Sequence, residues 1–126
     1  ALDEALEEME VSKARVKNAT VEGLIEDATQ HIDEIDDEKM LDAALVGAVQ
    51  KLELYCIAAW GTARSMGELF GQQKVVEAMQ SAIDEGKRFD EEMTKLAESE
   101  VNPAMLEGAD EDANEGSSKK SSGKKK

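Results

Sequence analysis

Three segments of the chain repeat apolar residues at the spacing of an amphipathic helix. In residues 20–35 the apolar positions lie three or four apart, at Val21, Leu24, Ile25, Ala28, Ile32 and Ile35. Residues 39–70 alternate steps of four and three, through Leu41, Leu45, Ala48, Leu52, Tyr55, Ala59, Thr62, Met66 and Leu69. Residues 73–99 keep the same rhythm, at Val75, Met79, Ala82, Gly86, Phe89, Met93 and Leu96. The pattern predicts three helices, the last two with heptad seams.

Residues with capping chemistry mark the ends of these helices. Thr20 is the expected N-cap of the first helix, and Asp36 and Asp37 end it and can cap the next. Gly71 suits the position after the second helix, and Asn102-Pro103 is expected to stop the third. A connection of two or three residues between helices 39–70 and 73–99 predicts an antiparallel hairpin.

Both ends of the chain differ from this helical region, which spans 20–100. Residues 1–11 place Leu2, Leu6 and Met9 on one helical face and are predicted to be the end of a longer helix, with 12–19 as a connector. Residues 101–126 carry an acidic block and then a lysine, serine and glycine block. With so few apolar side chains they are predicted to be a disordered tail. The lysines of residues 117–126 are interpreted as keeping the tail soluble. The alternative is that they make a weak contact with a polyanion.

Helix 39–70 is apolar beyond its seam, because Val49, Cys56, Ile57 and Trp60 widen the stripe. A single hairpin cannot cover a stripe that wide, so a second layer is needed from this chain or from another copy. The predicted fold is therefore all-α, a helical hairpin that forms half of a four-helix bundle and is completed through dimerisation. A coiled-coil rod is the competing arrangement.

Composition and charge narrow the classes of function. With 126 residues, 3% aromatics and a net charge of −14, the chain predicts one acidic helical domain that repels nucleic acid and anionic membranes. No 18-residue stretch is free of charge, so no membrane span is expected, and no signal-peptide pattern opens the chain. The lone Cys56 allows no internal disulfide and suits the cytoplasm.

Glu53 is the residue most suggestive of chemistry, since Val49, Cys56 and Ile57 surround it on the helix. Either its carboxylate reaches water at the edge of the seam, or it binds a metal in a helical bundle. Glu53 lies 17 residues before Phe70 and Asp90 17 residues after Gln73, so the helical rise places these two acids level in the hairpin. Glu85 is expected near the height of Ala58. The candidate metal ligands are thus Glu53, Glu85 and Asp90, although acids make up 29 of the 126 residues and chance pairs are common.

Other chemistry finds little support in the sequence. His31 is the only histidine and is read as a boundary residue, and no Glu-x-x-His pair is present. Cys56 is read as a small core residue and Tyr55 as a seam residue able to donate its hydroxyl to a carboxylate. No phosphate-binding loop or nucleophilic triad occurs. The sequence therefore predicts no catalytic residue and no organic cofactor, and it leaves open whether the protein is an enzyme.

Several stretches resemble a known family in order and spacing: Val21-Glu-Gly-Leu-Ile-Glu26, Asp42-Ala-Ala-Leu-Val46, Gln50-Lys-Leu-Glu-Leu-Tyr55, Ile57-Ala-Ala-Trp-Gly-Thr62, Ala82-Ile-Asp-Glu-Gly-Lys-Arg-Phe-Asp90 and Thr94-Lys-Leu-Ala97. From about Val16 to Ala97 the chain resembles the YciE/YciF family of ferritin-like bacterial proteins linked to stress. The resemblance implies a bundle of two helical hairpins around a carboxylate metal site, of which this chain matches the second hairpin and the short helix before it. The chain is therefore read as a truncated chain or a fragment, with a hairpin that dimerises to rebuild the bundle as the alternative.

The same resemblance assigns Glu53 to the acid of the third bundle helix and Glu85 and Asp90 to acids of the fourth. The family has Glu-His-Tyr-Glu where this chain has Glu53-Leu-Tyr-Cys56, and a further Glu where it has Gly86. The leading hypothesis is a stress-associated, ferritin-like protein with a partial or vestigial site for iron or another divalent metal. The alternative is a non-catalytic interaction module that forms homo- or hetero-oligomers through helices 39–70 and 73–99. A catalytic oxidase and a nucleic-acid binder rank below both.

Overall fold

The computed structural model describes residues 2–10 and 16–122, and within them all regular structure is helical. The elements are α1 (Leu2–Glu8), α2 (Ala19–Glu34), α3 (Glu38–Leu69), α4 (Gln73–Leu96), a short π-helix η1 (Ala97–Val101) and α5 (Asn102–Ser122). The all-α prediction is confirmed. Residues 11–15 of the expected connector and 123–126 of the expected tail lie outside the described residues.

The antiparallel hairpin of α3 and α4 is the centre of the fold. Asp37 caps α3, since its Oδ1 accepts a hydrogen bond of 2.7 Å from the Met40 amide. Gly71 follows the helix with a φ of +67°, a left-handed conformation that suits glycine. Close to this turn, a Cβ on Gly67 would lie 3.2 Å from Val75 and Val76, so the glycine lets α4 approach. The predicted cap and turn are confirmed.

Helix α2 lies along the other side of α3 and is attached to it by polar contacts. Its N-cap is Asn18, whose Oδ1 accepts from the Val21 amide at 3.1 Å and whose amide donates to Tyr55 Oη at 2.8 Å. Lys51 Nζ lies 3.1 Å from Asp27 Oδ2 further along. The prediction of Thr20 as the cap is wrong, because a tertiary contact with Tyr55 holds Asn18 where it can cap the helix.

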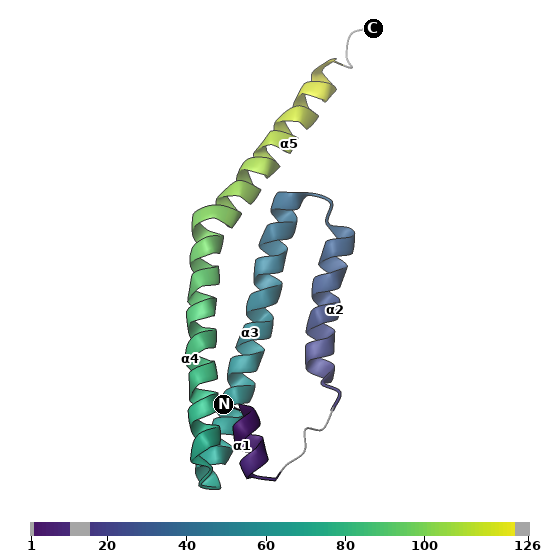
Figure 1. Cartoon of the computed structure of the whole chain (residues 1–126). Helices are drawn as coiled ribbons and strands as arrows, with labels where there is room; N and C mark the ends of the chain where they lie inside the picture. Colours follow the sequence, from purple (N-terminus) through teal and green to yellow (C-terminus); the bar gives the residue numbers. More distant parts are fainter. Residues whose placement is uncertain (1, 11–15, 123–126) are drawn as a thin grey trace.

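Helices α2, α3 and α4 form a single layer. Figure 1 shows α2, α3 and α4 side by side, with α3 in the middle and α1 beside the end of α4 near the turn. Among the described residues, the buried hydrophobic side chains are only Ala48, Met79 and Ile83. One layer of helices cannot enclose a core, so much of the apolar surface of α3 remains uncovered.

The C-terminal region differs from the sequence prediction. Instead of stopping at Asn102-Pro103, the helix passes through η1 into α5, which projects beyond the layer (Figure 1). In η1 the Asn102 amide bonds to the carbonyl of Ala97, five residues back. This wider turn relieves the clash between the ring of Pro103 and the preceding turn, and the missing proline N–H falls in the first turn of α5. The expected helix stop is therefore wrong, and residues 102–122 are helical where a disordered tail was expected.

Helix α3 is also the one described helix that is long and apolar enough to cross a membrane by length and composition. Its most apolar 18-residue window has a mean hydropathy of 1.2 and is 6% buried. The sequence predicts no membrane span, because Lys51 and Glu53 interrupt the apolar run. Both side chains have roles within the layer: Lys51 pairs with Asp27, and Glu53 packs against Gly86 of α4.

Candidate metal site on the open face

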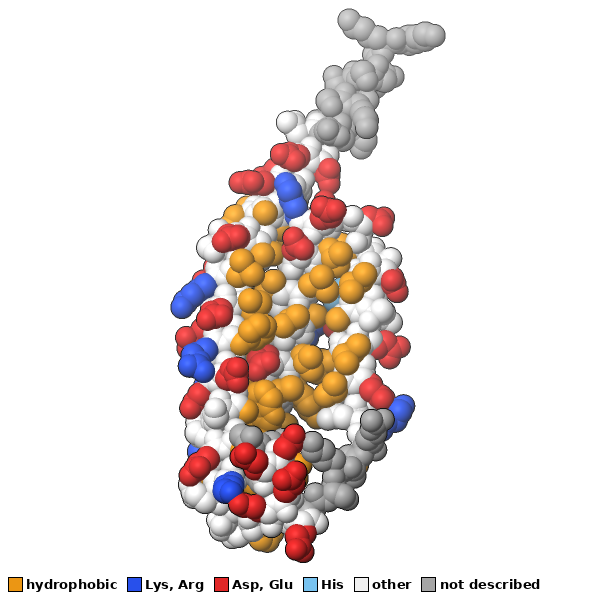
Figure 2. Space-filling model, in the orientation of Figure 1, with side chains coloured by type: hydrophobic (Ala, Val, Ile, Leu, Met, Phe, Trp, Pro, Cys, Tyr) orange, Lys and Arg blue, Asp and Glu red, His pale blue; other side chains and the backbone are white. Residues whose placement is uncertain are grey.

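One surface of the layer, here called the open face, contains three hollows along α3. The groove between α2 and α3 is lined by Leu24, Ile25, Ala28, Thr29, Ile32, Leu45, Ala48, Val49 and Leu52. The groove between α3 and the consecutive helices α4 and η1 is lined by Asp42, Leu45, Val46, Val49, Met93, Leu96, Glu100 and Val101. Leu45 and Val49 line both grooves, so the two form one surface. Figure 2 shows hydrophobic side chains gathered over these helices, with acidic side chains among them and around them.

The third hollow contains the acids. It measures about 340 Å³, and its lining comes from α3 and α4: Glu53, Trp60, Ala82, Glu85, Gly86 and Phe89. Two of the predicted ligands, Glu53 and Glu85, therefore border the same space from facing helices. The α4 residues follow the spacing i, i+3, i+4 and i+7 of one helical face, a signal in the sequence that could have identified Phe89 and Gly86 as lining residues.

Gly86 makes room for the Glu53 side chain. A Cβ at position 86 would overlap Glu53 Oε1 and would lie 3.0 Å from Ile57 Cγ1 and 3.2 Å from Trp60 Cζ3. Gly86 is buried, whereas Glu53 is half-buried beside apolar neighbours. The resemblance reads Gly86 as a lost acidic ligand, but here its missing side chain is what accommodates the carboxylate of Glu53.

Asp90 is not part of this hollow. Gln50 Nε2 donates to Asp90 Oδ1 and to Thr94 Oγ1, each at 3.0 Å. The prediction that Asp90 is a ligand together with Glu53 stays a prediction, because counting the rise gives height along a helix and not direction around it. Asp90 follows Glu85 by five residues, which turns it about 140° around α4.

The pKa of Cys56 reflects its burial and the charge of the nearby Glu53. Burial raises the pKa of the Cys56 thiol above its ordinary value, and the negative charge of Glu53 raises it further. The thiol is therefore protonated at neutral pH and is a poor metal ligand. Tyr55 donates to Asn18 rather than to a carboxylate, and His31 Nε2 lies 3.7 Å from Asp27 on α2, remote from the lining of the hollow.

The hollow can supply two carboxylates from one chain. Within residues 2–10 and 16–122, no group of three or more His, Cys, Asp or Glu side chains lies close enough to hold a metal ion. Carboxylate oxygens suit hard or borderline divalent cations. A cation held by Glu53 and Glu85 would therefore need water or another protein surface to complete its coordination.

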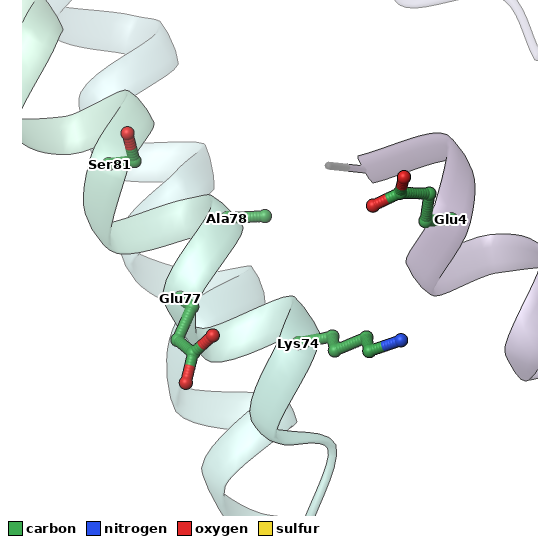
Figure 3. Close-up of a pocket in the computed structure, with 5 residues that line it drawn as sticks. All are labelled: Glu4, Lys74, Glu77, Ala78 and Ser81. Atoms are coloured by element: carbon green, nitrogen blue, oxygen red, sulfur yellow. The ribbon is translucent and has the colours of Figure 1, made fainter.

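A different polar hollow, between α1 and α4, serves to attach α1. It is lined by Glu4, Lys74, Glu77, Ala78 and Ser81. Figure 3 shows Lys74 extending from α4 toward α1, where its ammonium donates to Glu8. That hydrogen bond, together with nearby acids, raises the pKa of Lys74. The Lys74 ammonium itself supplies the positive charge beside these acids, so this hollow is a contact that attaches α1 to α4.

Known proteins with this architecture were found by sequence and by structure. Residues 1–106 match the family described as "Domain of unknown function (DUF892)". Protein YciF of Escherichia coli (strain K12) is 35% identical over 102 residues, which are 80% of this chain and 61% of YciF. The crystal structure of the E. coli stress protein YciF matches with a TM-score of 0.74 at 35% identity, over 80% of this chain and 64% of that one. The chain thus spans less than two thirds of the relative's length. Because the family match covers most of its residues, this chain belongs to the DUF892 family and is a helical protein of the YciF type.

Proposed function

We propose that this chain is a ferritin-like, stress-associated cytoplasmic protein that binds a divalent metal ion, iron foremost, through Glu53 and Glu85. The observation that carries the proposal is that these carboxylates, from two facing helices, line one hollow whose other walls are apolar. Glu53 is half-buried and Glu85 is exposed. A half-buried carboxylate among apolar neighbours is less costly when a cation compensates its charge. A divalent cation supplies that compensation.

The composition of the chain and the neighbouring residues favour a cation over other ligands. The net charge of −14 raises the local concentration of cations and lowers that of anions. Gly86 leaves room for the Glu53 carboxylate, and Cys56 stays protonated, so oxygen atoms are the donors. Asp90, already bonded to Gln50 and turned away from Glu85, is left out of the proposed ligand set.

The proposed role is binding rather than catalysis. Oxygen-activating di-iron bundles use four carboxylates and two histidines from four helices, and the hollow of one chain offers two carboxylates. Cys56 and Gly86 occupy positions at which the resemblance has glutamates. We therefore expect modest affinity and no oxidase activity.

The test is an anaerobic titration of the full chain with Fe(II) and Mn(II), followed by measurement of the metal-to-chain ratio after gel filtration. Bound metal should be lost in the Glu53→Gln/Glu85→Gln variant. It should be retained in Glu91→Gln, which removes an exposed acid of α4, the helix that carries Glu85. A bound cation should also lower the pKa of Cys56 and speed its alkylation. Equal metal binding by wild type and the double variant would exclude this site.

A second candidate function is that of a non-catalytic interaction module. It is favoured by the open face, where Ile25, Ile32 and Val49 remain exposed beside the two apolar grooves. The two functions are compatible, because the hollow with Glu53 and Glu85 lies along the same helices.

A further inference from the structure

The place of the Glu53 carboxylate depends on one particular alignment of α3 with α4. A Cβ at position 86 would overlap Glu53 Oε1, so this point of α4 leaves room for the carboxylate only because it is a glycine. One turn away in either direction, the same face of α4 carries Ala82 and Phe89, each of which has a Cβ. A shift of one turn between the two helices would therefore remove the carboxylate from the hollow.

The turn between α3 and α4 is too far from Glu53 to fix that alignment. Glu53 lies 17 residues before Phe70, which ends α3, and this separation corresponds to about 25 Å along the helix. Over such a length, a small change in the angle between two helices becomes a large displacement. Hydrophobic contacts along the seam are non-directional and resist sliding less than hydrogen bonds do. A directional contact close to Glu53 is needed to fix the height and rotation of α4.

Gln50 supplies such a contact one turn before Glu53. Its Nε2 donates to Asp90 Oδ1 and to Thr94 Oγ1, each at 3.0 Å, and lies 3.4 Å from the Asp90 carbonyl oxygen. Asp90 and Thr94 are four residues apart on α4, so one amide bonds to two successive turns. Gln50 and Asp90 are both half-buried, and hydrogen bonds to a carboxylate are the stronger kind. These three residues are here called the register contact.

We propose that the register contact positions the Glu53 carboxylate at Gly86, where it borders the same hollow as Glu85. Asp90 lies one turn beyond Gly86 on α4, so the register contact and the contact of Glu53 with Gly86 are neighbours. Asp90 then acts as an acceptor for Gln50 and not as a metal ligand. The consequence for metal binding rests on the proposed function, whereas the positioning of Glu53 stands on the contacts alone.

The register contact is tested with Gln50→Met, which removes the amide and keeps a side chain of similar length. Gln80→Met is the matched control. Gln80 also joins the two helices, because its Oε1 accepts from Arg64 Nη1 at 2.8 Å, but it is outside the lining of the hollow. Each variant loses a contact between α3 and α4. Circular dichroism and urea denaturation check that both stay folded.

The first measurement is the rate of Cys56 alkylation in EDTA, which needs no metal. Burial raises the pKa of the Cys56 thiol, and the negative charge of Glu53 raises it further. A carboxylate that leaves the hollow for water has a weaker effect. Gln50→Met should therefore speed alkylation nearly as much as Glu53→Gln does, and Gln80→Met should leave the rate unchanged.

The two substitutions should also depend on each other. Gln50→Met should add little to the rate in a chain that already carries Glu53→Gln, since the register contact acts through Glu53. Equal acceleration by Gln50→Met and Gln80→Met would overturn the proposal, because loosening of the hairpin would then explain both. Additive effects of Gln50→Met and Glu53→Gln would overturn it as well.

The second measurement is the Mn(II) affinity of the full chain, followed by the electron paramagnetic resonance of the free ion. Replacing a residue that orients a metal ligand lowers affinity by about 10–100-fold, so Gln50→Met should weaken binding at least tenfold and Gln80→Met should not. Asp90→Asn separates positioning from ligation, because the new amide oxygen still accepts from Gln50 while the carboxylate charge is gone.

Asp90→Asn should therefore keep both the wild-type affinity for Mn(II) and the wild-type rate of Cys56 alkylation. A tenfold loss of Mn(II) affinity in this variant, with alkylation unchanged, would make Asp90 a ligand and overturn its assignment as a positioning residue. If the wild-type chain binds no Mn(II), the proposed function fails, and the alkylation rates still decide whether the register contact positions Glu53.

Discussion

Gly86 shows how a single residue shapes the candidate site. Helical periodicity places it on the inner face of α4, where a larger apolar residue would be ordinary. In the structure, the side chains of Glu53, Ile57 and Trp60 all pack against Gly86. Gly61, on α3, has no atom within 4 Å of the position that its Cβ would take. The two glycines therefore make a matched pair for mutation.

Replacing each glycine by alanine should have opposite effects on stability. Alanine is the better helix former by about 1 kcal/mol, so Gly61→Ala should raise the free energy of unfolding by about 0.5–1 kcal/mol. Gly86→Ala should lower it by about 1–2 kcal/mol, because the new methyl group collides with Glu53 and crowds Ile57. Urea denaturation measures both changes. Stabilisation of equal size by the two substitutions would show that Glu53 does not pack on Gly86.

Cys56 provides a test of the charge on Glu53. The pKa of its thiol is raised above 9.0 in the folded chain, by burial and then by Glu53. Iodoacetamide at pH 8 should therefore alkylate the folded chain more slowly than the urea-unfolded chain, and Glu53→Gln should speed the reaction. The unfolded state loses the thiol proton first, so the free energy of unfolding should fall as pH rises through and above 9.0. Alkylation that ignores the Glu53 substitution would remove Glu53 as a cause.

At the scale of elements, helix boundaries follow local capping residues wherever no tertiary contact or unusual turn competes with them. Asp37 caps α3 and Gly71 ends it, both as the sequence predicts. Where a tertiary contact or an unusual turn intervenes, the prediction fails. Asn18 replaces Thr20 as the cap of α2 because Tyr55 holds it, and η1 carries the helix past Pro103 through a bond between residues five apart.

The cap of α3 should contribute measurably to stability. Asp37→Ala removes the hydrogen bond to the Met40 amide and should lower the free energy of unfolding by about 1 kcal/mol. Asp36→Ala removes a neighbouring acid that does not cap the helix and should change it by less than about 0.5 kcal/mol. Thermal unfolding followed by circular dichroism compares them. Equal losses would mean that general charge, rather than the cap, matters at this end of α3.

At the scale of the whole molecule, electrostatic repulsion opposes the open, one-layer architecture. A net charge of −14 is carried by a chain with little buried core, and acidic side chains surround the open face (Figure 2). Repulsion among them resists folding. Salt shortens the range of that repulsion from about 10 Å at 0.1 M to about 3 Å at 1 M.

Raising NaCl from 0.1 to 1 M should therefore stabilise the folded protein. A gain of about 1 kcal/mol would raise the unfolding temperature by about 4 °C for a domain of this size. Differential scanning calorimetry at both salt concentrations measures the shift, with sodium chloride chosen because it does not bind carboxylates strongly. A lower unfolding temperature at 1 M would show that ion pairs such as Lys51–Asp27 outweigh the repulsion.

The sequence by itself determined the helices, the α3–α4 hairpin, the caps at Asp37 and Gly71, and the acidic surface. These depend on spacing along the chain, on local hydrogen bonds and on a short turn, all of which can be read from neighbouring residues. Glu53 and Glu85 were also found from their positions along the helices. Only the tertiary structure decided that these two share a hollow while Asp90 pairs with Gln50, and that Gly86 receives the Glu53 side chain. Those outcomes depend on the direction of each side chain around its helix and on how closely two helices approach, and neither quantity is contained in the spacing of residues.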